Sequence, residues 1–285
     1  MSKVAVIGAG TMGNGIAHVF AQHEWQTLLI DVNAEQLKRG RAMIEKNTER
    51  QVSKGTLTED RRHQMLGRIT TTSNIEILKG VSDLELVVEA ITENPQVKFD
   101  TFRALSRLTA PSAILASNTS SISITEIAGH TGRAANVIGM HFMNPVPVMP
   151  LVEVVRGRET GDQVVDRVVE IAKQLGKTPV VVRDAPGFVS NRVLMPMINE
   201  AILCVQEGVA TPAAVDQVMT LGMKHPLGPL ALADLIGLDV CLAIMEVLRD
   251  GFANPKYEPA RLLRDMVAQG KLGRKSGAGF YGYSD

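Results

Sequence analysis

Short apolar runs alternate with amphipathic stretches over the first two thirds of the chain. Buried strands are predicted at residues 3–7, 27–30, 68–72, 84–91, 113–117 and 179–182. Apolar residues at helical spacing predict helices over residues 16–21, 96–108 and 162–175. Strands that alternate with helices are typical of α/β proteins, because each helix carries the chain back across the sheet. The pattern therefore predicts an open α/β sheet.

The stretch at about residues 34–68 departs from this alternation. It is too long for an ordinary crossover helix. Its periodicity predicts one helix that ends before Gly55 and a second helix over residues 57–66. We therefore expect a helical hairpin that is inserted in the α/β domain and projects from its sheet.

The chain changes character at residues 184–187, Asp-Ala-Pro-Gly. From this point the pattern is helical throughout, which predicts an α/β domain over residues 1–184 and an all-α domain over residues 185–285. Residues 230–248 are apolar on most faces and predict one long helix that is buried on several sides. Because one helical layer leaves part of such a helix uncovered, we expect part of it to face a second subunit.

Composition narrows the class of protein. The 285 residues are 45% hydrophobic, enough for a substantial core, and no apolar run reaches the roughly 18 residues that a membrane span needs. Thirty basic and thirty acidic residues leave no net charge, which disfavours nucleic acid as a partner. Cys204 and Cys241 make no disulfide framework, and neither they nor the His residues have metal-ligand spacing. We expect a cytoplasmic protein without metal site, membrane span or signal peptide.

A glycine-rich turn, Gly8-Ala9-Gly10-Thr11-Met12-Gly13, follows the first strand. Its three glycines permit the tight turn, the approach of a pyrophosphate and close packing of helix on strand, in that order. The next strand ends at Asp31, where an acid accepts from a ribose 2′-OH and repels a 2′-phosphate. Glycines also make ordinary turns. Strand, turn, helix and acid together predict a Rossmann-type dinucleotide-binding domain that prefers NAD to NADP.

Two apolar runs flank a proline-rich turn in residues 137–155, and each run carries one titratable residue, His141 in the first and Glu153 in the second. A carboxylate in such a run is costly to bury alone, and His141 is the nearest partner. A carboxylate that holds a His orients its ring and supports the imidazolium form, as in general acid–base sites. The same pattern fits a core His beside a solvent-facing Glu on an edge strand.

Polar residues follow the predicted strands at their carboxyl ends, where open α/β sheets bind ligands. Glu93, Ser120 and His141 are the candidates. Each has an ordinary alternative role. In particular, Ser120 or Ser121 could simply cap the helix that runs through Ile127.

The predicted hairpin is basic in an otherwise neutral protein. Its bases are Lys38, Arg39, Arg41, Lys46, Arg50, Lys54, Arg61, Arg62 and Arg68. Its acids are Glu35, Glu45, Glu49, Glu59 and Asp60, so nine minus five leaves +4. Such a run is usually a solvated face, and the alternative is a landing site for a phosphate-bearing ligand.

These segments together resemble the 3-hydroxyacyl-CoA dehydrogenase family over nearly the whole chain. The segments that carry the resemblance are residues 8–13, 87–93, 116–121, 141–149, 151–155, 184–192 and 277–281. The combination of His-Phe-x-Asn-Pro-x-Pro with the later Pro-Gly-Phe-x-x-Asn-Arg is highly specific. The resemblance implies NAD-dependent oxidation of an (S)-3-hydroxyacyl-CoA to a 3-ketoacyl-CoA, by a homodimer formed through the helical domain.

The resemblance also implies roles for single residues. His141 matches the catalytic base and Glu153 its partner, while Ser120 and Asn191 match the residues that contact the substrate. The positions that match the cofactor side are Asp31, Glu93, Lys98, Asn144 and Lys275. Lys54 matches a lysine that contacts CoA, which gives the basic hairpin a ligand. Asn47 departs from the family, which has a CoA-contacting serine there.

Within the family, 3-hydroxybutyryl-CoA is the expected substrate, because 285 residues leave no room for the hydratase domain of multifunctional enzymes. One rival is a sugar-acid dehydrogenase resembling L-gulonate 3-dehydrogenase, against which the basic hairpin argues. Another is a non-catalytic NAD-binding protein of the crystallin kind, against which the intact site residues argue. Fatty-acid oxidation, butyrate formation and aromatic catabolism all remain open as pathways.

Overall fold

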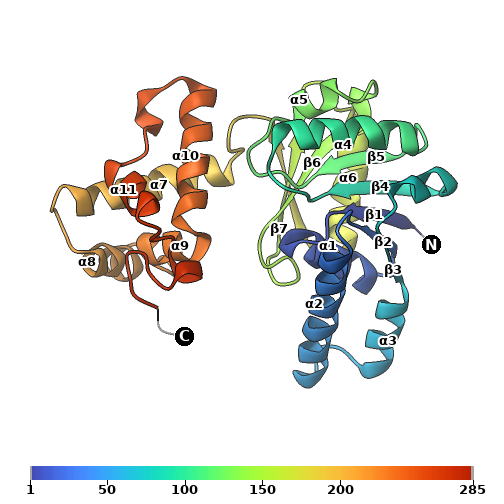
Figure 1. Ribbon diagram of the computed structural model, residues 1–285, viewed down its shortest axis with the longest axis horizontal. Helices are drawn as coiled ribbons and strands as arrows, with labels where there is room; N and C mark the ends of the chain where they lie inside the picture. The colour runs from blue at the N-terminus through green and yellow to red at the C-terminus, as the bar shows by residue number, and fades with distance from the viewer. Residues whose placement is uncertain (1, 284–285) are drawn as a thin grey trace. The chain divides into compact units, whose positions relative to one another are not determined.

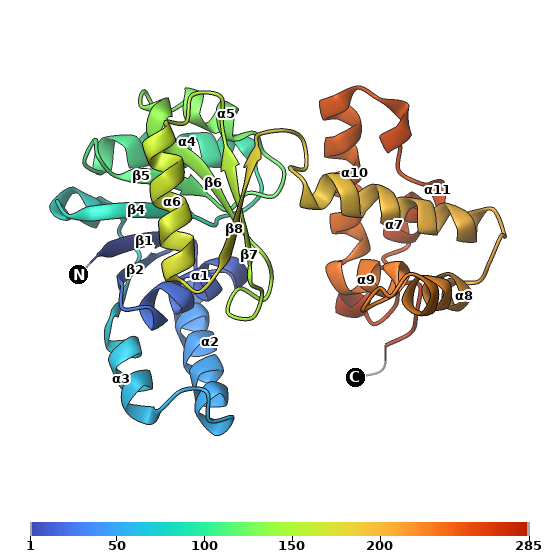
Figure 2. The same cartoon turned by 180° about the vertical axis from the view of Figure 1, so that it is seen from behind.

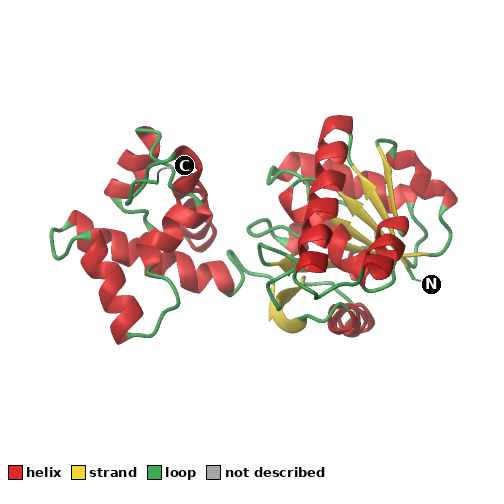
Figure 3. Ribbon diagram, turned by 90° about the horizontal axis from the view of Figure 1, so that it is seen from below, coloured by secondary structure: helices red, strands yellow, loops and turns green. Residues whose placement is uncertain are grey.

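The computed structural model describes residues 2–283, and the chain divides at Asp184 into two compact units. The first unit holds a sheet with helices on both faces, and the second is helical (Figures 1 and 3). The α/β class and the helical second part are as predicted from the sequence.

One sheet runs through the first unit. Its strands are β1 (Lys3–Ile7), β2 (Gln26–Ile30), β3 (Ile69–Thr72), β4 (Leu84–Glu89), β5 (Ile114–Ser117), β6 (Val137–Phe142), β7 (Leu151–Arg156) and β8 (Thr178–Arg183). Their spatial order is β3-β2-β1-β4-β5-β6-β7-β8, and every neighbouring pair is parallel except β6 and β7. The order reverses between β1 and β4, which is where doubly wound sheets bind dinucleotides.

Helices cover both faces of this sheet. They are α1 (Thr11–Gln22), α4 (Pro95–Leu108), α5 (Ile124–Gly129) and α6 (Asp162–Gln174), with the short η1 (Ile75–Gly80) and η2 (Ala134–Asn136). Helices α1 and α6 lie on one face and α4 and α5 on the other (Figures 1 and 2). Apolar side chains such as Phe20 on α1, Val168 on α6 and Val6 on β1 form the core between α1, α6 and the sheet.

The inserted hairpin consists of α2 (Ala34–Ser53) and α3 (Glu59–Gly67), with Gly55 in the connection, as predicted. Figure 1 shows it extending away from the sheet. Asn33 caps α2 by accepting from the Gln36 N–H. The Arg41 guanidinium donates to the carbonyls of Leu66 and Ile69, so it ties α2 to the end of α3 and the start of β3.

The second unit is built from helices around its own core. They are α7 (Ser190–Gln206), α8 (Pro212–Gln217), the π-helical η3 (Val218–Gly222), α9 (Pro229–Ile236), α10 (Leu238–Phe252), η4 (Pro255–Tyr257), α11 (Arg261–Ala268) and η5 (Arg274–Ser276). Met195, Ile202, Leu230, Met245 and Leu263 are among the buried side chains that hold the helices together.

The prediction of one helix over residues 230–248 is wrong. The chain breaks at Gly237, which has φ +105° and ends α9 as it begins α10. Within α9, Asp234 is 1% exposed and accepts from the N–H groups of Phe280 and Tyr281. The buried carboxylate therefore holds the C-terminal segment against this break, a contact that the apolar pattern does not reveal.

Candidate active site

His141 and Glu153 face each other across the antiparallel pair β6–β7, in which they are directly opposite. The distance from His141 Nδ1 to Glu153 Oε2 is 2.8 Å, and the residues are 8% and 2% exposed. Strand β7 is an interior strand between β6 and β8. A solvent-facing Glu on an edge strand is thereby excluded, and the two side chains form a buried pair.

This geometry suits a proton acceptor. An ionised carboxylate can only accept, so Glu153 fixes the proton of the neutral ring on Nδ1 and leaves the acceptor lone pair on Nε2. If the ring takes a second proton, the carboxylate at 2.8 Å stabilises the resulting imidazolium. The pair can therefore take a proton from a hydroxyl and return it.

The turn between β6 and β7 carries Asn144, which is exposed. Lys177, which precedes β8, holds this turn by donating from Nζ to the carbonyls of Val146 and Met149 at 2.6 and 2.8 Å. Burial lowers the pKa of the Lys177 ammonium. No motif in the sequence marks Lys177, and only the fold shows that it supports the turn next to His141.

The glycine turn matches a dinucleotide pyrophosphate. Gly8 has φ +99°, and a Cβ there would lie 2.6 Å from the Ala90 carbonyl oxygen. A Cβ on Gly13 would lie 1.8 Å from the Gly8 oxygen, whereas one on Gly10 would meet nothing within 4 Å. Internal packing thus requires glycine at the first and third positions but not at Gly10, as expected where a ligand approaches. Gly10 is the N-cap of α1, and no side chain caps this end of the helix. The backbone N–H groups at the start of α1 can therefore donate to a phosphate.

Asp31 follows β2 beside this turn. Its Oδ2 accepts from the Ala9 N–H at 2.8 Å and its Oδ1 from the Asn33 N–H at 2.9 Å. A carboxylate has about four lone-pair directions, so a ribose hydroxyl can still donate to it. Asp31 thus joins the glycine turn to the start of α2.

Ser120 lies in the loop after β5, where Glu93 binds the backbone. Glu93 Oε1 accepts from the N–H groups of Ser120 and Ser121 at 2.9 and 3.2 Å. The alternative cap role is wrong, because Ser123 caps α5 by accepting from the Glu126 N–H. Burial alone would raise the pKa of Glu93, but the Lys98 ammonium and the hydrogen bonds from this loop lower it on balance.

Lys98 is 1% exposed and lies between two carboxylates. Its Nζ is 2.6 Å from Glu89 Oε1 and 3.2 Å from Glu93 Oε2. The Ser117 hydroxyl donates to the other oxygen of Glu89 at 2.6 Å. Sequence reasoning gave Glu89 and Ser117 no role, although both lie in segments that carry the family resemblance.

The Ser120 loop is also tied to the strand of His141. Asn118 Oδ1 accepts from the Phe142 N–H at 2.9 Å. Because β5 and β6 are neighbouring parallel strands, their carboxyl ends bring Ser120 and His141 to the same edge of the sheet.

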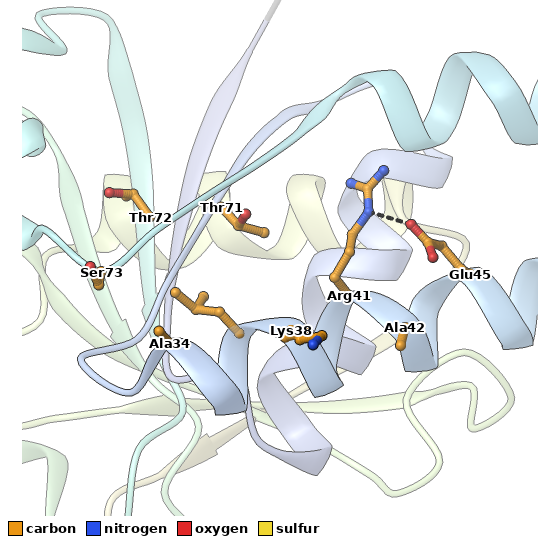
Figure 4. Close-up of a pocket in the computed structure, with 9 residues that line it drawn as sticks. Ala34, Lys38, Arg41, Ala42, Glu45, Thr71, Thr72 and Ser73 are labelled. Atoms are coloured by element: carbon orange, nitrogen blue, oxygen red, sulfur yellow. Dashed lines mark hydrogen bonds and ion pairs between the residues drawn. The ribbon is translucent and has the colours of Figure 1, made fainter.

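In the part of the chain that the structure describes, the basic residues of the hairpin are of two kinds, those with a structural partner and those without one. Arg41 pairs with Glu45 at 2.9 Å, beside a hollow of about 680 Å³ between α2 and β3 (Figure 4). Arg62 pairs with Glu59 and Arg68 contacts a carbonyl of α1, so these three have structural partners. Within residues 2–283, no side-chain hydrogen bond or ion pair is found for Lys38, Arg39, Lys46, Arg50, Lys54 and Arg61.

Four of the latter bases form a stripe along α2. Arg39, Lys46 and Arg50 share one side of the helix at 3.6 residues per turn, and Lys54, the C-cap residue directly after α2, continues the stripe. Asn47, seven residues before Lys54, lies on that side too. The hollow of Figure 4 opens on a different side of the helix. The stripe is therefore available to an anionic ligand.

Two predicted site residues belong to the second unit. Asn191, 8% exposed, is in the first turn of α7, and its N–H donates to the Gly187 carbonyl at 3.1 Å. Lys275 pairs with Asp239 at 2.5 Å. The structure gathers the other predicted catalytic and cofactor residues in the first unit.

A metal site and a membrane-spanning helix are two further features that the structure can reveal. Within residues 2–283, no three His, Cys, Asp or Glu side chains come together as a metal site. No helix in this range is both long and apolar enough to cross a membrane.

The chain matches two family models. The 3-hydroxyacyl-CoA dehydrogenase NAD-binding domain covers residues 3–185, and the C-terminal domain of the same family covers residues 187–283. A probable 3-hydroxybutyryl-CoA dehydrogenase of Deinococcus radiodurans is 57% identical over 99% of this chain and 100% of its own. The 3-hydroxybutyryl-CoA dehydrogenase of Bradyrhizobium diazoefficiens is 49% identical over 99% and 96%.

Solved structures agree. The (S)-3-hydroxybutyryl-CoA dehydrogenase of Ralstonia eutropha is 47% identical, covers 100% of both chains and has a TM-score of 0.96. A diketoreductase at 28% identity has a TM-score of 0.85 over 99% of both chains, so the fold by itself admits other substrates. With both family models matched and relatives near 50% identity over their full length, this chain belongs to the 3-hydroxyacyl-CoA dehydrogenase family.

Proposed function

We propose that this chain catalyses the NAD-dependent oxidation of (S)-3-hydroxyacyl-CoA to 3-ketoacyl-CoA and its reverse, with 3-hydroxybutyryl-CoA and acetoacetyl-CoA as the main pair. The observation that carries the proposal is the buried His141–Glu153 pair, at the same edge of the sheet as the glycine turn. The relatives named as 3-hydroxybutyryl-CoA dehydrogenases support the choice of substrate.

In this proposal the chain moves one proton and positions two oxygens. NAD, when bound, supplies the acceptor for the hydride that leaves C3. His141 Nε2 takes the C3 hydroxyl proton as the C3 carbonyl forms, and Glu153 stabilises the imidazolium. Ser120 and Asn191 hold substrate oxygens so that C3 is oriented for transfer. In the reverse direction His141 must start protonated and gives its proton to the new alkoxide.

We assign the cofactor to the glycine turn and its surroundings. The turn over residues 8–13 offers N–H donors to the pyrophosphate, and Asp31 accepts from the adenosine ribose. Glu93, Asn144 and Lys275 are proposed on the nicotinamide side. Lys98 is buried, so it acts on that side through Glu93.

The stripe on α2 is proposed as the landing site of CoA. CoA carries several phosphates, and Lys46, Arg50 and Lys54 present ammonium and guanidinium groups in a row. Asn47 lies among them and can donate from its amide. A sugar acid has no phosphates to use this surface.

A panel of substrates tests the proposal. The loss of NADH is measured with acetoacetyl-CoA, and the formation of NADH with (S)-3-hydroxybutyryl-CoA and with L-gulonate. Turnover of both CoA thioesters and not of L-gulonate is expected. Turnover of L-gulonate alone would identify a sugar-acid dehydrogenase. NADH binding without any turnover would identify a non-catalytic NAD-binding protein.

We also propose a cytoplasmic homodimer joined through the helical domain. Large apolar side chains are exposed there, including Leu221 at 81%, Val193 at 65% and Met223 at 61%, and burial in an interface would stabilise them. Light scattering should give about twice 30.8 kDa at micromolar concentration. A mass of one chain would refute the dimer.

Acyl chains of increasing length, assayed in turn, would show whether the enzyme serves fatty-acid oxidation or short-chain metabolism.

A further inference from the structure

Glu89, the last residue of β4, is a carboxylate that the mechanism above leaves without a role. It is 0% exposed. A buried charge is costly unless it is paired and hydrogen-bonded, and here every partner is present. Lys98 Nζ lies at 2.6 Å, the Ile91 N–H at 2.7 Å and the Ser117 hydroxyl at 2.6 Å.

The placement of Lys98 is unfavourable by itself. It lies in the first turns of α4, whose N-cap is Asn94, where the helix dipole favours negative charge. It is also 1% exposed. Only specific partners offset both costs, and these are Glu89 and Glu93. The three side chains carry a net charge of −1 when all are ionised.

Two branches lead from Glu89 to the Ser120 loop. In the first branch, Lys98 bridges Glu89 to Glu93, which accepts from the Ser120 N–H. In the second branch, the Ser117 hydroxyl donates to Glu89 and accepts from the Thr119 N–H at 3.2 Å. Both branches end on residues 119–121 and lie inside the α/β unit.

We propose that Glu89 is a positioning residue, which fixes the Ser120 loop beside His141 through Lys98–Glu93 and through Ser117. This inference rests on the proposed function, in which Ser120 holds the substrate. Glu89 does not touch the substrate. Removing its charge or its link to Ser117 loosens the loop while leaving the proton acceptor intact.

The first test measures the loop directly, by amide hydrogen exchange over residues 118–121. The variants are Glu89→Gln, which keeps the side-chain shape, and Ser117→Ala. The matched control is Thr160→Val, which removes another buried hydroxyl that bonds the Val137 carbonyl at the opposite end of β6. Exchange in the loop should rise about tenfold relative to the other strands in both variants and not in the control. A rise common to all strands would overturn the proposal.

The second test is kinetic, with acetoacetyl-CoA and NADH. Glu89→Gln should lower kcat about tenfold, since a displacement of about 1 Å at a reacting group costs up to about 10². In a Ser120→Ala background the same change should have no further effect, because Glu89 acts through Ser120. An equal loss in both backgrounds would show that Glu89 acts elsewhere. A wild-type protein without turnover would refute the proposed function, while hydrogen exchange would still decide whether Glu89 holds the loop.

Discussion

The His141–Glu153 pair should act as one unit in catalysis. Glu153→Gln tests this most cleanly, because glutamine keeps the shape and an acceptor oxygen for Nδ1 and removes only the charge. At the observed 2.8 Å, two unit charges attract by about 6 kcal/mol at an effective dielectric constant of about 20. This is an upper limit, since the amide dipole retains part of the interaction. We expect a loss of about 1.4 to 4 kcal/mol in transition-state stabilisation, or about 10- to 10³-fold in kcat.

The assay is a double-mutant cycle on kcat, with acetoacetyl-CoA and NADH. His141→Ala removes the proton acceptor and should cost about 10² to 10⁴. The double variant should be about as slow as His141→Ala alone, because Glu153 then has no imidazolium to support.

A control variant separates this effect from a general loss of charge. Glu85, near the start of β4, pairs with Arg167. Glu85→Gln removes this carboxylate, which lies outside the His141–Glu153 pair, and should leave kcat within about twofold. Thermal unfolding checks that all variants are folded. If the losses from His141→Ala and Glu153→Gln multiply, the two residues act independently and the reasoning from their pairing is wrong.

Three further predictions concern other parts of the α/β unit. Asp31→Ala should narrow a preference for NADH over NADPH, and equal efficiency of the wild type with both cofactors would contradict the role of Asp31. Lys54→Ala should raise KM for acetoacetyl-CoA more than KM for a pantetheine-truncated thioester, and the rise should be larger at low salt. Lys38→Ala, on another side of α2, should leave the KM of both substrates unchanged. If Lys54→Ala changes both KM values equally, Lys54 is only a solvated surface residue. The pKa of Glu93 is lowered in the folded state, so ionised Glu93 stabilises the fold above its ordinary pKa of 4.5, and this stabilisation is lost as the pH falls through its pKa in the folded protein. The loss of unfolding free energy caused by Glu93→Gln should therefore shrink as the pH falls below 4.5, and a loss that stays constant would contradict this role of Glu93.

Local patterns predicted the elements of the first unit because each depends on neighbouring residues. Strand β1, the glycine turn and the break at Gly55 are all written in short stretches. The prediction of one helix over residues 230–248 is wrong because an apolar run does not show that the chain turns at Gly237 with φ +105°. Nor does the run show that Asp234 binds a segment more than 40 residues later.

The candidate site divides in the same way. His141 and Glu153 are twelve residues apart across one turn, so the pairing was open to inference from the chain. Glu89 meets Ser117 across 28 residues and through the register of β4 and β5. Burial of Lys98 likewise depends on packing that no spacing rule expresses. The contacts that the sequence does not predict are those that hold the Ser120 loop through residues outside it.

The central claim is that this chain reduces a 3-ketoacyl-CoA with NADH through a proton held by His141. The most direct measurement follows NADH consumption and the product with acetoacetyl-CoA, for the wild type and for His141→Asn, alongside NADH binding by fluorescence. The account predicts one (S)-3-hydroxybutyryl-CoA formed per NADH consumed by the wild type. It predicts a loss of at least about 10² in kcat for His141→Asn with NADH affinity retained. Equal turnover by the two proteins, or none by a wild type that binds both ligands, would contradict it.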